Sequence, residues 1–413
     1  MIATLPKPVG RCVTAHVGAR DHYQLSLALH EAGMLERLVT EAYAPDWLSS
    51  IAPKQTSKRY CPHLSSSAVA VSKKALGLTA LARLMGRNSS HRIDRAISQR
   101  AYKVAVQSQA NLFLYSYYAY WAFRQAIEEG LPARRVLFQL HPHPYSIRQL
   151  LEQEIERVPF AAQSILDEEE FRLPLAGLEA LALEPSLATH CITASQFTKA
   201  TLVQNGIPNH RIQVIPYGVD TTRFATRTAR PMSSFRIIFV GRMNQRKGLA
   251  DLLEAVRLLR YQRVEVVLCG RGYVDTNILR AYQDLPVRVL LNLSSEQLLH
   301  ELHQSHVFVL PALAEGFGHV ILEAMAAGLP VITTTNTGAP DIMQAGVHGA
   351  IVPIRDPQRI CEQLEAGISR PNDWFDMGQE AAQQAQQFAW SRFRAQIAAV
   401  YKEVITKQPA LPV

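Results

Sequence analysis

The sequence has no long apolar run. No stretch reaches the roughly 18 to 20 consecutive apolar residues that a helix needs to span a bilayer. The first residues, Met1 to Gly18, also contain no uninterrupted apolar segment followed by the small residues of a signal-peptide cleavage site. We therefore expect a protein that is neither exported nor held in a membrane by a helix of its own.

Cysteine is scarce, odd in number and widely scattered. The chain has five cysteines in 413 residues, which excludes a dense disulfide framework. Most of them lie inside apolar, strand-like runs, as small buried thiols do in a reducing compartment. The sequence thus predicts a cytoplasmic protein without disulfides or a cysteine metal site. The residues concerned are Cys12, Cys61, Cys191, Cys269 and Cys361.

Acidic residues are almost missing from residues 51–110. This segment holds eleven Lys or Arg against the single acid Asp94, an excess of +10 in a chain whose net charge is +8. Cations interleaved with apolar residues suit a surface that faces anionic lipid head groups or an acidic acceptor, although a solvated face of surface helices explains them equally. No aromatic platform or known nucleic-acid module accompanies the charge, so we expect no nucleic-acid partner. Four of the cations are Lys73, Lys74, Arg83 and Arg87.

Length and patterning indicate two α/β domains. A chain of 413 residues exceeds what one hydrophobic core usually serves. Short β-branched runs alternate with longer helical periods, which favours parallel sheets joined by helices. We place the first domain at residues 1–215 and the second at 216–389, with the polar segment 208–234 as their connection.

Individual elements can be predicted from the same pattern. In the first half, strands are expected at 11–17, 112–115, 136–140 and 190–193, the last of these closing the first sheet, and a helix from Asp21 to about Gly33 follows a turn at Gly18. In the second half, strands are expected at 235–240, 264–268, 307–310 and 331–334, with helices at 249–260 and 318–327 and a further helix starting at Asp356-Pro357.

A first candidate site follows the strand at 235–240. The loop after this strand holds Gly241, Arg242 and Lys247. Ligands of open α/β sheets lie beyond the carboxyl ends of the strands, so both cations project where a phosphorylated ligand binds. A guanidinium grips phosphate through two hydrogen bonds, and an ammonium adds a mobile point charge. A basic surface loop without a ligand is the alternative interpretation.

A second candidate site is the run Glu315-Gly-Phe-Gly, which precedes a helix. Gly316 and Gly318 allow the backbone to approach a ligand closely, and the N–H groups at the start of the helix form an anion site. A carboxylate suits hydroxyl groups rather than phosphate, so Glu315 is expected at sugar hydroxyls and Glu323 at a ribose diol. Alternatively, Glu315 caps the helix and Glu323 is an exposed helix position.

Together the two runs are much more specific than either alone. They lie about 75 residues apart, with Gly270-Arg271-Gly272 at a strand end between them. The combination resembles the donor-binding domain of family-4 glycosyltransferases, group 1 type, in which Gly-Arg, four residues and Lys precede Glu-Gly-Phe-Gly and a second Glu. The four charged residues of that pattern correspond to Arg242, Lys247, Glu315 and Glu323.

The resemblance implies the GT-B fold, which consists of two facing Rossmann-like domains with parallel sheets. It extends over residues 190–402, where Ser195 and the run 216–220 resemble the family's serine motif and linker. The end of the chain, 390–413, resembles the helix that crosses back to the first domain. The resemblance is poor over 35–135, the part of the chain expected to vary with the acceptor.

The N-terminal half departs from the family pattern. Many relatives carry two glycines after the first strand to admit the donor phosphate, whereas this chain has Gly18-Ala19 followed by Arg20. The family's active-site histidine after the fourth strand corresponds to His141 or His143. His141 lies nearer the strand end and is preferred, and a structural role for either residue stays open.

The resemblance implies a retaining transferase without a bound metal or other cofactor. Such an enzyme moves a sugar from a nucleotide-diphosphate sugar to a hydroxyl acceptor. The basic segment favours a lipid-linked or cell-surface glycan at the inner face of a membrane as this acceptor. A nucleotide-sugar epimerase and a non-catalytic glycan- or lipid-binding subunit are the alternatives. We assign catalysis to Glu315, His141, Arg242 and Lys247, and donor binding to Gly18, Gly241, Arg242, Lys247, Gly270, Arg271, Glu315, Gly316, Phe317, Gly318 and Glu323.

Overall fold

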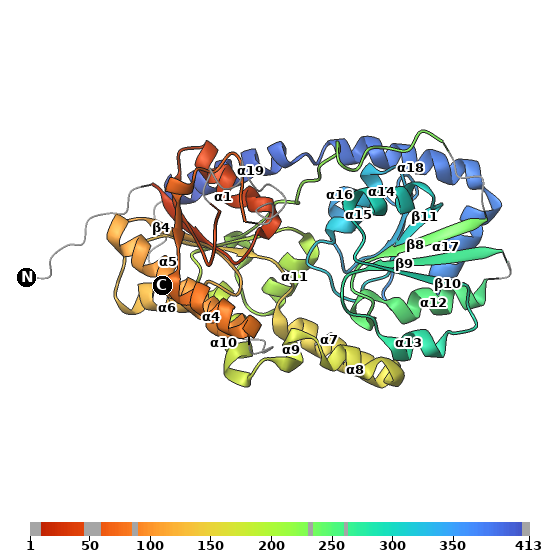
Figure 1. The fold of residues 1–413 in the computed structure, drawn as a ribbon, viewed down its shortest axis with the longest axis horizontal. Coiled ribbons are helices and arrows are strands. Elements are labelled where there is room, and N and C mark those ends of the chain that lie inside the picture. Colours follow the sequence, from red (N-terminus) through yellow and green to blue (C-terminus); the bar gives the residue numbers. More distant parts are fainter. Residues whose placement is uncertain (1–9, 45–58, 85–89, 230–233, 260–262, 407–413) are drawn as a thin grey trace, which may run out of the picture.

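The computed structural model describes residues 10–44, 59–84, 90–229, 234–259 and 263–406. It has two lobes, each with a central sheet covered by helices (Figure 1). Parts of the basic segment, residues 51–58 and 85–89 with Arg87, lie outside the described residues. None of the described helices is both long and apolar enough to cross a bilayer.

The first sheet has seven parallel strands in the order β3-β2-β1-β4-β5-β6-β7. Its strand order reverses between β1 and β4, which is the position where doubly wound sheets bind their ligands. The strands are β1 (Cys12–Ala15), β2 (Leu35–Thr40), β3 (Val69–Val71), β4 (Asn111–Tyr115), β5 (Arg135–Gln139), β6 (His190–Thr193) and β7 (Ile212–Val214).

The second sheet has six parallel strands in the order β10-β9-β8-β11-β12-β13, so its order reverses between β8 and β11. Every residue of β11 and β12 is buried, as expected for strands covered by helices on both faces. The strands are β8 (Phe235–Val240), β9 (Val264–Gly270), β10 (Val287–Leu291), β11 (Val307–Leu310), β12 (Val331–Thr334) and β13 (Gly349–Val352).

The helices cover both sheets and connect the parallel strands (Figure 1). Those of the first lobe are α1 (Gln24–Glu31), α4 (Lys73–Leu84), α5 (Ser90–Ser108), α6 (Tyr120–Glu128), α7 (Pro144–Arg157), α8 (Ala162–Leu166), α9 (Glu169–Arg172), α10 (Leu175–Leu187) and α11 (Gln196–Gln204). Those that follow are α12 (Leu249–Leu258), α13 (Thr276–Ala281), α14 (Ser295–His303), α15 (His319–Ala326), α16 (Ala339–Ile342), α17 (Pro357–Ser369), α18 (Pro371–Gln386) and α19 (Trp390–Thr406).

Short 3-10 helices complete the described part of the chain: η1 (Arg20–Tyr23), η2 (Ser66–Ala68), η3 (Pro159–Ala161), η4 (Asn209–Arg211) and η5 (Gln245–Lys247). The predicted start of the helix at Asp356-Pro357 is confirmed. The Asp356 side chain accepts from the Arg359 N–H at the start of α17, and Gly328 follows α15 with φ +83°.

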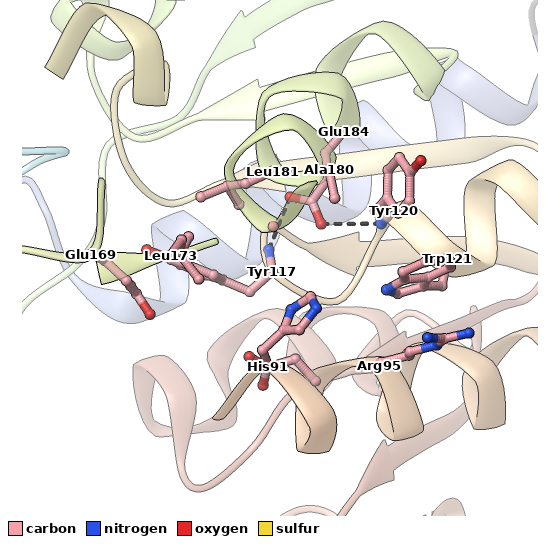
Figure 2. Close-up of a pocket in the computed structure, with 12 residues that line it drawn as sticks. His91, Arg95, Tyr117, Tyr120, Trp121, Glu169, Leu173, Ala180, Leu181 and Glu184 are labelled. Atoms are coloured by element: carbon pink, nitrogen blue, oxygen red, sulfur yellow. Dashed lines mark hydrogen bonds between the residues drawn. The ribbon is translucent and has the colours of Figure 1, made fainter. Parts of the chain in front are cut away.

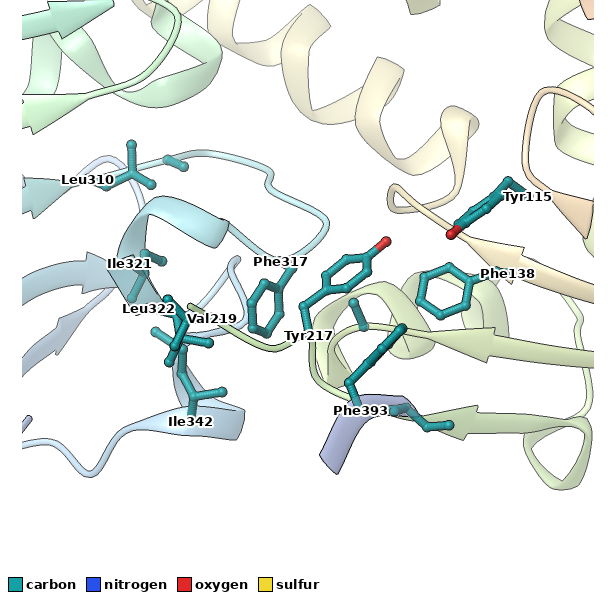
Figure 3. Packing of buried hydrophobic residues seen from close by; sticks show 14 of the residues in the cluster. Tyr115, Phe138, Tyr217, Val219, Leu310, Phe317, Ile321, Leu322, Ile342 and Phe393 are labelled. Atoms are coloured by element: carbon teal, nitrogen blue, oxygen red, sulfur yellow. The ribbon is translucent and has the colours of Figure 1, made fainter. Parts of the chain in front are cut away.

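The C-terminal helix α19 returns to the first domain, as the resemblance implied. It packs against α1, and Asn111 at the start of β4 donates from Nδ2 to the Tyr401 hydroxyl at 3.0 Å. Where the chain crosses between the lobes, the Tyr217 ring lies among aromatic side chains of both, with Phe317 on one side and Phe138 and Phe393 on the other (Figure 3). The expected GT-B architecture of two parallel-sheet domains is confirmed.

Three sequence predictions were wrong in detail. Residues 190–193 do not close the first sheet, because β7 pairs beside β6 within the segment interpreted as an interdomain connection. The first α-helix starts at Gln24 rather than Asp21, since residues 21–23 have left-handed backbone angles. The helix expected to reach residue 260 ends at Leu258.

Candidate active site

The candidate site lies where the carboxyl ends of the two sheets face each other. The loops after β8 and β11, at the reversal of strand order, carry Arg242, Lys247 and Glu315. A Cβ built on Gly316 would lie 2.1 Å from the Leu140 carbonyl oxygen and 3.2 Å from the His141 Cα, so only glycine fits there. The second-domain loop and the end of β5 are therefore in direct backbone contact.

Side chains of the first domain hold the Gly316 carbonyl. It accepts from the Ser195 hydroxyl at 2.6 Å and from the Thr198 hydroxyl at 3.1 Å, both at the start of α11. Gly318, which has φ +87°, begins α15, and the buried Phe317 lies between them. Glycine is thus required at the two predicted positions for different reasons. At Gly316 the backbone of the other domain comes too close for a side chain, and at Gly318 the backbone conformation favours glycine.

The loop after β8 is fixed by its own sequence. The Asn244 side chain accepts from the Lys247 N–H and caps η5, which turns the Lys247 ammonium toward Glu315, with which it forms an ion pair. Gly248 then has φ +72°, and a Cβ there would lie 1.9 Å from the Pro311 carbonyl oxygen. The two predicted site residues Lys247 and Glu315 therefore face each other.

Lys247 has an unusual protonation equilibrium. Burial is the main cause that lowers its pKa to about 7, and the neighbouring Arg246 lowers it further. An anionic ligand at this position favours the ammonium and raises the pKa again. The protonation state of Lys247 can therefore change when a phosphate binds.

Arg242 forms an ion pair with a carboxylate from the other lobe. Its guanidinium lies 3.2 Å from the Glu168 carboxylate and over the Tyr273 ring, 4.7 Å from the centroid. Glu168, which lies between α8 and α9, also accepts from Asn244 at 2.6 Å and from Arg246 at 2.9 Å. Both predicted phosphate-binding cations are thus paired with carboxylates.

The remaining donor-binding candidates of the second domain lie at the edge of this cluster. A Cβ on Gly270 would lie 2.7 Å from the Gly241 carbonyl oxygen, so the ends of β8 and β9 are in close contact. Glu323 on α15 is half-buried rather than exposed, and burial raises its pKa while Arg223 and Arg271 lower it. Arg271 itself is exposed.

Gly18 lies in the loop after β1, apart from the cations of the second domain. It has φ +70°, and its N–H donates to Glu41 at 3.2 Å. Three later residues have positive φ angles of 40° (Asp21), 54° (His22) and 65° (Tyr23). Residues other than glycine rarely adopt this backbone conformation. Burial lowers the pKa of His319 at the start of α15 to about 4, and the charge of His22 lowers it further.

The two candidate histidines have different surroundings. His143 caps α7 by accepting from the Tyr145 N–H through Nδ1, and its Nε2 lies 3.2 Å from the Ala182 carbonyl oxygen. His141 is buried, and its Nε2 has no hydrogen-bond partner in the described part of the chain. Only His141 therefore has a ring nitrogen available for a ligand.

Sequence reasoning missed two residues of the site. Glu168 stands in the acidic run 167–170, which is visible in the sequence, but its partner Arg242 is distant along the chain. Tyr117 follows β4, and its ring centroid lies 4.9 Å from that of His141. A residue after a strand at the reversal of strand order is the only sequence signal that could have indicated Tyr117.

Comparison with known proteins identifies the second domain. Residues 220–386 match the family model described as glycosyl transferases group 1. Residues 220–386 are thus similar to a group 1 glycosyltransferase domain. Among the residues described, no cluster of three or more His, Cys, Asp or Glu could hold a metal ion.

Curated relatives of this glycosyltransferase domain are similar over part of their length. A putative colanic acid biosynthesis glycosyltransferase, WcaL of Escherichia coli, is 30% identical over 178 residues, which are 40% of this chain and 44% of that protein. A D-inositol 3-phosphate glycosyltransferase of Pseudarthrobacter chlorophenolicus is 30% identical over 250 residues, 55% of this chain and 60% of that protein. The chain thus spans about half the length of the curated relatives it matches.

Solved structures share the whole fold. Sucrose-phosphate synthase from Thermosynechococcus elongatus matches with a TM-score of 0.69 and 16% identity, over 96% of this chain and 99% of that chain. HepE of Anabaena, solved in complex with UDP and glucose, matches with a TM-score of 0.61 and 16% identity, over 95% and 99%. At 16% identity, both similarities show a shared fold.

Proposed function

We propose that the protein is a retaining glycosyltransferase that moves a sugar from a nucleotide-diphosphate sugar to a hydroxyl group of a glycan or lipid-linked acceptor. The observations that carry the proposal are that Arg242 and Lys247 follow β8 at the carboxyl end of the second sheet, that Lys247 pairs with Glu315, and that the adjacent Gly316 lies against His141 of the first domain. The group 1 glycosyltransferase domain at 220–386 and the printed names of its relatives support it.

In this proposal the donor diphosphate takes the place of the carboxylates that pair with Arg242 and Lys247. When the bond between the anomeric carbon and the phosphate oxygen breaks, its electron pair goes to the diphosphate. Arg242, Lys247 and the N–H groups of Phe317 and Gly318 stabilise that charge, and each such donor typically contributes about 3 kcal/mol. This stabilisation is why we expect no metal ion to be needed.

The acceptor oxygen attacks the anomeric carbon on the face that the diphosphate leaves, and its proton goes to the departing phosphate oxygen. A carboxylate that accepts hydrogen bonds from sugar hydroxyls is a poor covalent nucleophile, so Glu315 does not attack the anomeric carbon once the diphosphate has displaced it from Lys247. Glu315 instead accepts from donor sugar hydroxyls, and Glu323 from the ribose diol. A glycosyl adduct trapped on a carboxylate would contradict this mechanism.

A lipid-linked acceptor is supported by helix α4. Its exposed side chains include Lys73 and Lys74 and also Leu76 and Leu81, which are 46% and 51% exposed. Cations beside exposed leucines suit the boundary between lipid head groups and acyl chains. Loss of binding to anionic vesicles on changing Lys73 and Lys74 to Gln is the expected result, and unchanged binding would contradict the membrane part alone.

The first test is thermal stabilisation by a panel of nucleotide diphosphates and nucleotide sugars. We expect a selective rise in Tm that is lost in Lys247→Ala and Glu323→Ala and kept in Lys402→Ala, an exposed lysine on α19. With the donor known, transfer to a glycan acceptor should persist in EDTA and give a product with the anomeric configuration of the donor. An isomerised nucleotide sugar without a glycoside product would indicate an epimerase, and no response to any nucleotide would indicate a non-catalytic subunit.

A further inference from the structure

A tyrosine of the second domain lies against one of the predicted phosphate-binding cations. The Arg242 guanidinium lies over the Tyr273 ring, 4.7 Å from its centroid. The loops that carry the two side chains run side by side, since the residues that follow them, Met243 and Val274, form a parallel bridge. The Asp275 N–H also donates to the Met243 carbonyl at 2.9 Å. The backbone contacts of the two loops therefore set this stacking.

The stacking leaves the edge of the guanidinium available. A ring contacts the face of a guanidinium, whereas the N–H groups point outward in its plane. Nη1 of Arg242 lies 3.2 Å from the Glu168 carboxylate. Nε is buried and has no hydrogen-bond partner among the residues that the structure describes. Because a buried donor without a partner costs stability, this edge is suited to an oxygen atom of an anionic ligand.

Two consecutive residues of the first domain reach both members of the stacked pair. Asp167, the residue that ends α8, forms a side-chain hydrogen bond with Tyr273. Burial raises the pKa of Tyr273, and the charges of Asp275 and Asp167 raise it further. Glu168, the next residue, pairs with Arg242 itself. The stacked pair therefore lies at the contact between the two lobes.

The acidic run 167–170 is held within the first domain at Tyr117. Glu169 of this run forms a side-chain hydrogen bond with Tyr117. The backbone at Tyr117 is fixed in turn by Glu184, whose carboxylate accepts from the N–H groups of Tyr117, Ala119 and Tyr120 at 2.9, 3.0 and 3.1 Å (Figure 2). The first domain thus provides a firm support for the residues that reach Arg242 and Tyr273.

We propose that Tyr273 is a positioning residue for Arg242: its ring holds the guanidinium so that the available edge binds the diphosphate of the donor. The identity of the anion rests on the proposed transferase function, whereas the stacking does not. When the diphosphate displaces Glu168, the ring is the contact that keeps the guanidinium in orientation. A side chain that is already held loses less conformational entropy on binding than one that is free.

The test measures the Kd of inorganic pyrophosphate and of a panel of nucleoside diphosphates by calorimetry, with the full chain. Tyr273→Leu removes the ring and should weaken binding about five- to tenfold, because the cation–π contact is lost. Tyr273→Phe keeps the ring and loses the hydrogen bond with Asp167, so its Kd should stay within about twofold of the wild type. Unchanged binding by Tyr273→Leu, or an equal loss in Tyr273→Phe, would overturn the proposal.

A second arginine–tyrosine pair of the same domain is the matched control. The Arg257 guanidinium lies over the Tyr282 ring, 5.0 Å from its centroid, and the Tyr282 hydroxyl donates to Glu254 at 3.1 Å. Neither member of this pair is a donor-binding candidate. Tyr282→Leu should therefore leave the Kd of pyrophosphate unchanged. A loss as large as in Tyr273→Leu would show a general effect on the fold and would contradict the positioning role.

A double-mutant cycle separates positioning from packing. In an Arg242→Ala background nothing is left for the ring to hold, so Tyr273→Leu should change the Kd of pyrophosphate less than about twofold. A full additional loss would overturn the role.

The outcome for sugar transfer is distinguishable. If pyrophosphate binds with this dependence but no sugar is transferred, the transferase function fails and the role of Tyr273 in anion binding stands. If sugar is transferred and Tyr273→Leu binds the donor as tightly as the wild type, only the role of Tyr273 is overturned. A wild-type chain that binds neither pyrophosphate nor any nucleotide would contradict both.

Discussion

At the scale of single residues, His141 and His143 have separable roles. Burial lowers the pKa of His141 to about 4, so its ring is neutral at pH 7 and acts through hydrogen bonds. We expect His141→Ala to lower kcat about 100-fold or more with an unchanged Tm. His143→Ala should instead reduce the free energy of unfolding by about 1 to 2 kcal/mol, because it removes the cap of α7.

Steady-state kinetics and urea denaturation of both variants measure this difference. If the folded His143→Ala protein shows a larger decrease in kcat than His141→Ala, His143 and not His141 is the active-site histidine.

Lys247 makes donor binding depend on pH. Its pKa of about 7 lies below the ordinary 10.5, so above pH 7 the free protein holds Lys247 largely neutral, while a bound diphosphate favours the ammonium. Binding should therefore take up a proton at pH 8, and affinity should fall by up to about tenfold for each pH unit above 7. Calorimetry in buffers with different ionisation enthalpies measures the uptake. Lys247→Arg, which stays charged, should remove it, and a wild-type enthalpy independent of the buffer would refute the prediction.

At the scale of elements, the turn from η5 into α12 depends on Gly248. A Cβ there meets the Pro311 carbonyl oxygen at 1.9 Å in a left-handed backbone conformation, so Gly248→Ala should reduce the free energy of unfolding by about 3 kcal/mol or more. Gly130 after α6 is the matched control. It has φ +63° with no atom within 4 Å of the added Cβ, and Gly130→Ala should cost about 1 kcal/mol. Equal losses in urea denaturation would show that the Pro311 contact does not matter.

The sequence predicted the elements whose signal is local. β11 is a continuous apolar run, β8 is apolar except for Arg236, and the start of α15 follows glycines, so pattern and turn chemistry agree. The three-residue strands β3 and β7 are too short for a periodic signal, and β10 is only partly buried. Residues 21–23 have left-handed backbone angles but include no glycine, so the sequence gives no signal for this conformation.

At the scale of the whole molecule, Glu168 connects the lobes, and in the proposed function it would compete with the donor diphosphate for Arg242. It pairs with Arg242 at 3.2 Å, whereas Glu170 pairs only with Arg246, at 3.3 Å. Because a diphosphate must displace Glu168, we expect Glu168→Gln to tighten nucleotide-diphosphate binding about three- to tenfold. Glu170→Gln should leave the Kd unchanged. Calorimetric titration of both variants checks this, and weaker binding by Glu168→Gln would show that the contact only supports the fold.

This part of the site could not be read from the sequence. The motifs at 241–247 and 315–323 allowed a donor side to be predicted, because each is contiguous along the chain. Glu168, the partner of Arg242, comes from the other lobe and is joined to that motif only by the tertiary structure. Tyr117 is joined to His141 in the same way.

The return of α19 to the first domain also has a consequence for how the chain is made. Residues 390–406 cover α1 and contact β4, so the first domain lacks part of its own core until these residues have left the ribosome. Domains usually fold in the order of their synthesis, but here the domain that is translated first is completed last. Until then the apolar face of α1 is open to chaperones and to neighbouring nascent chains.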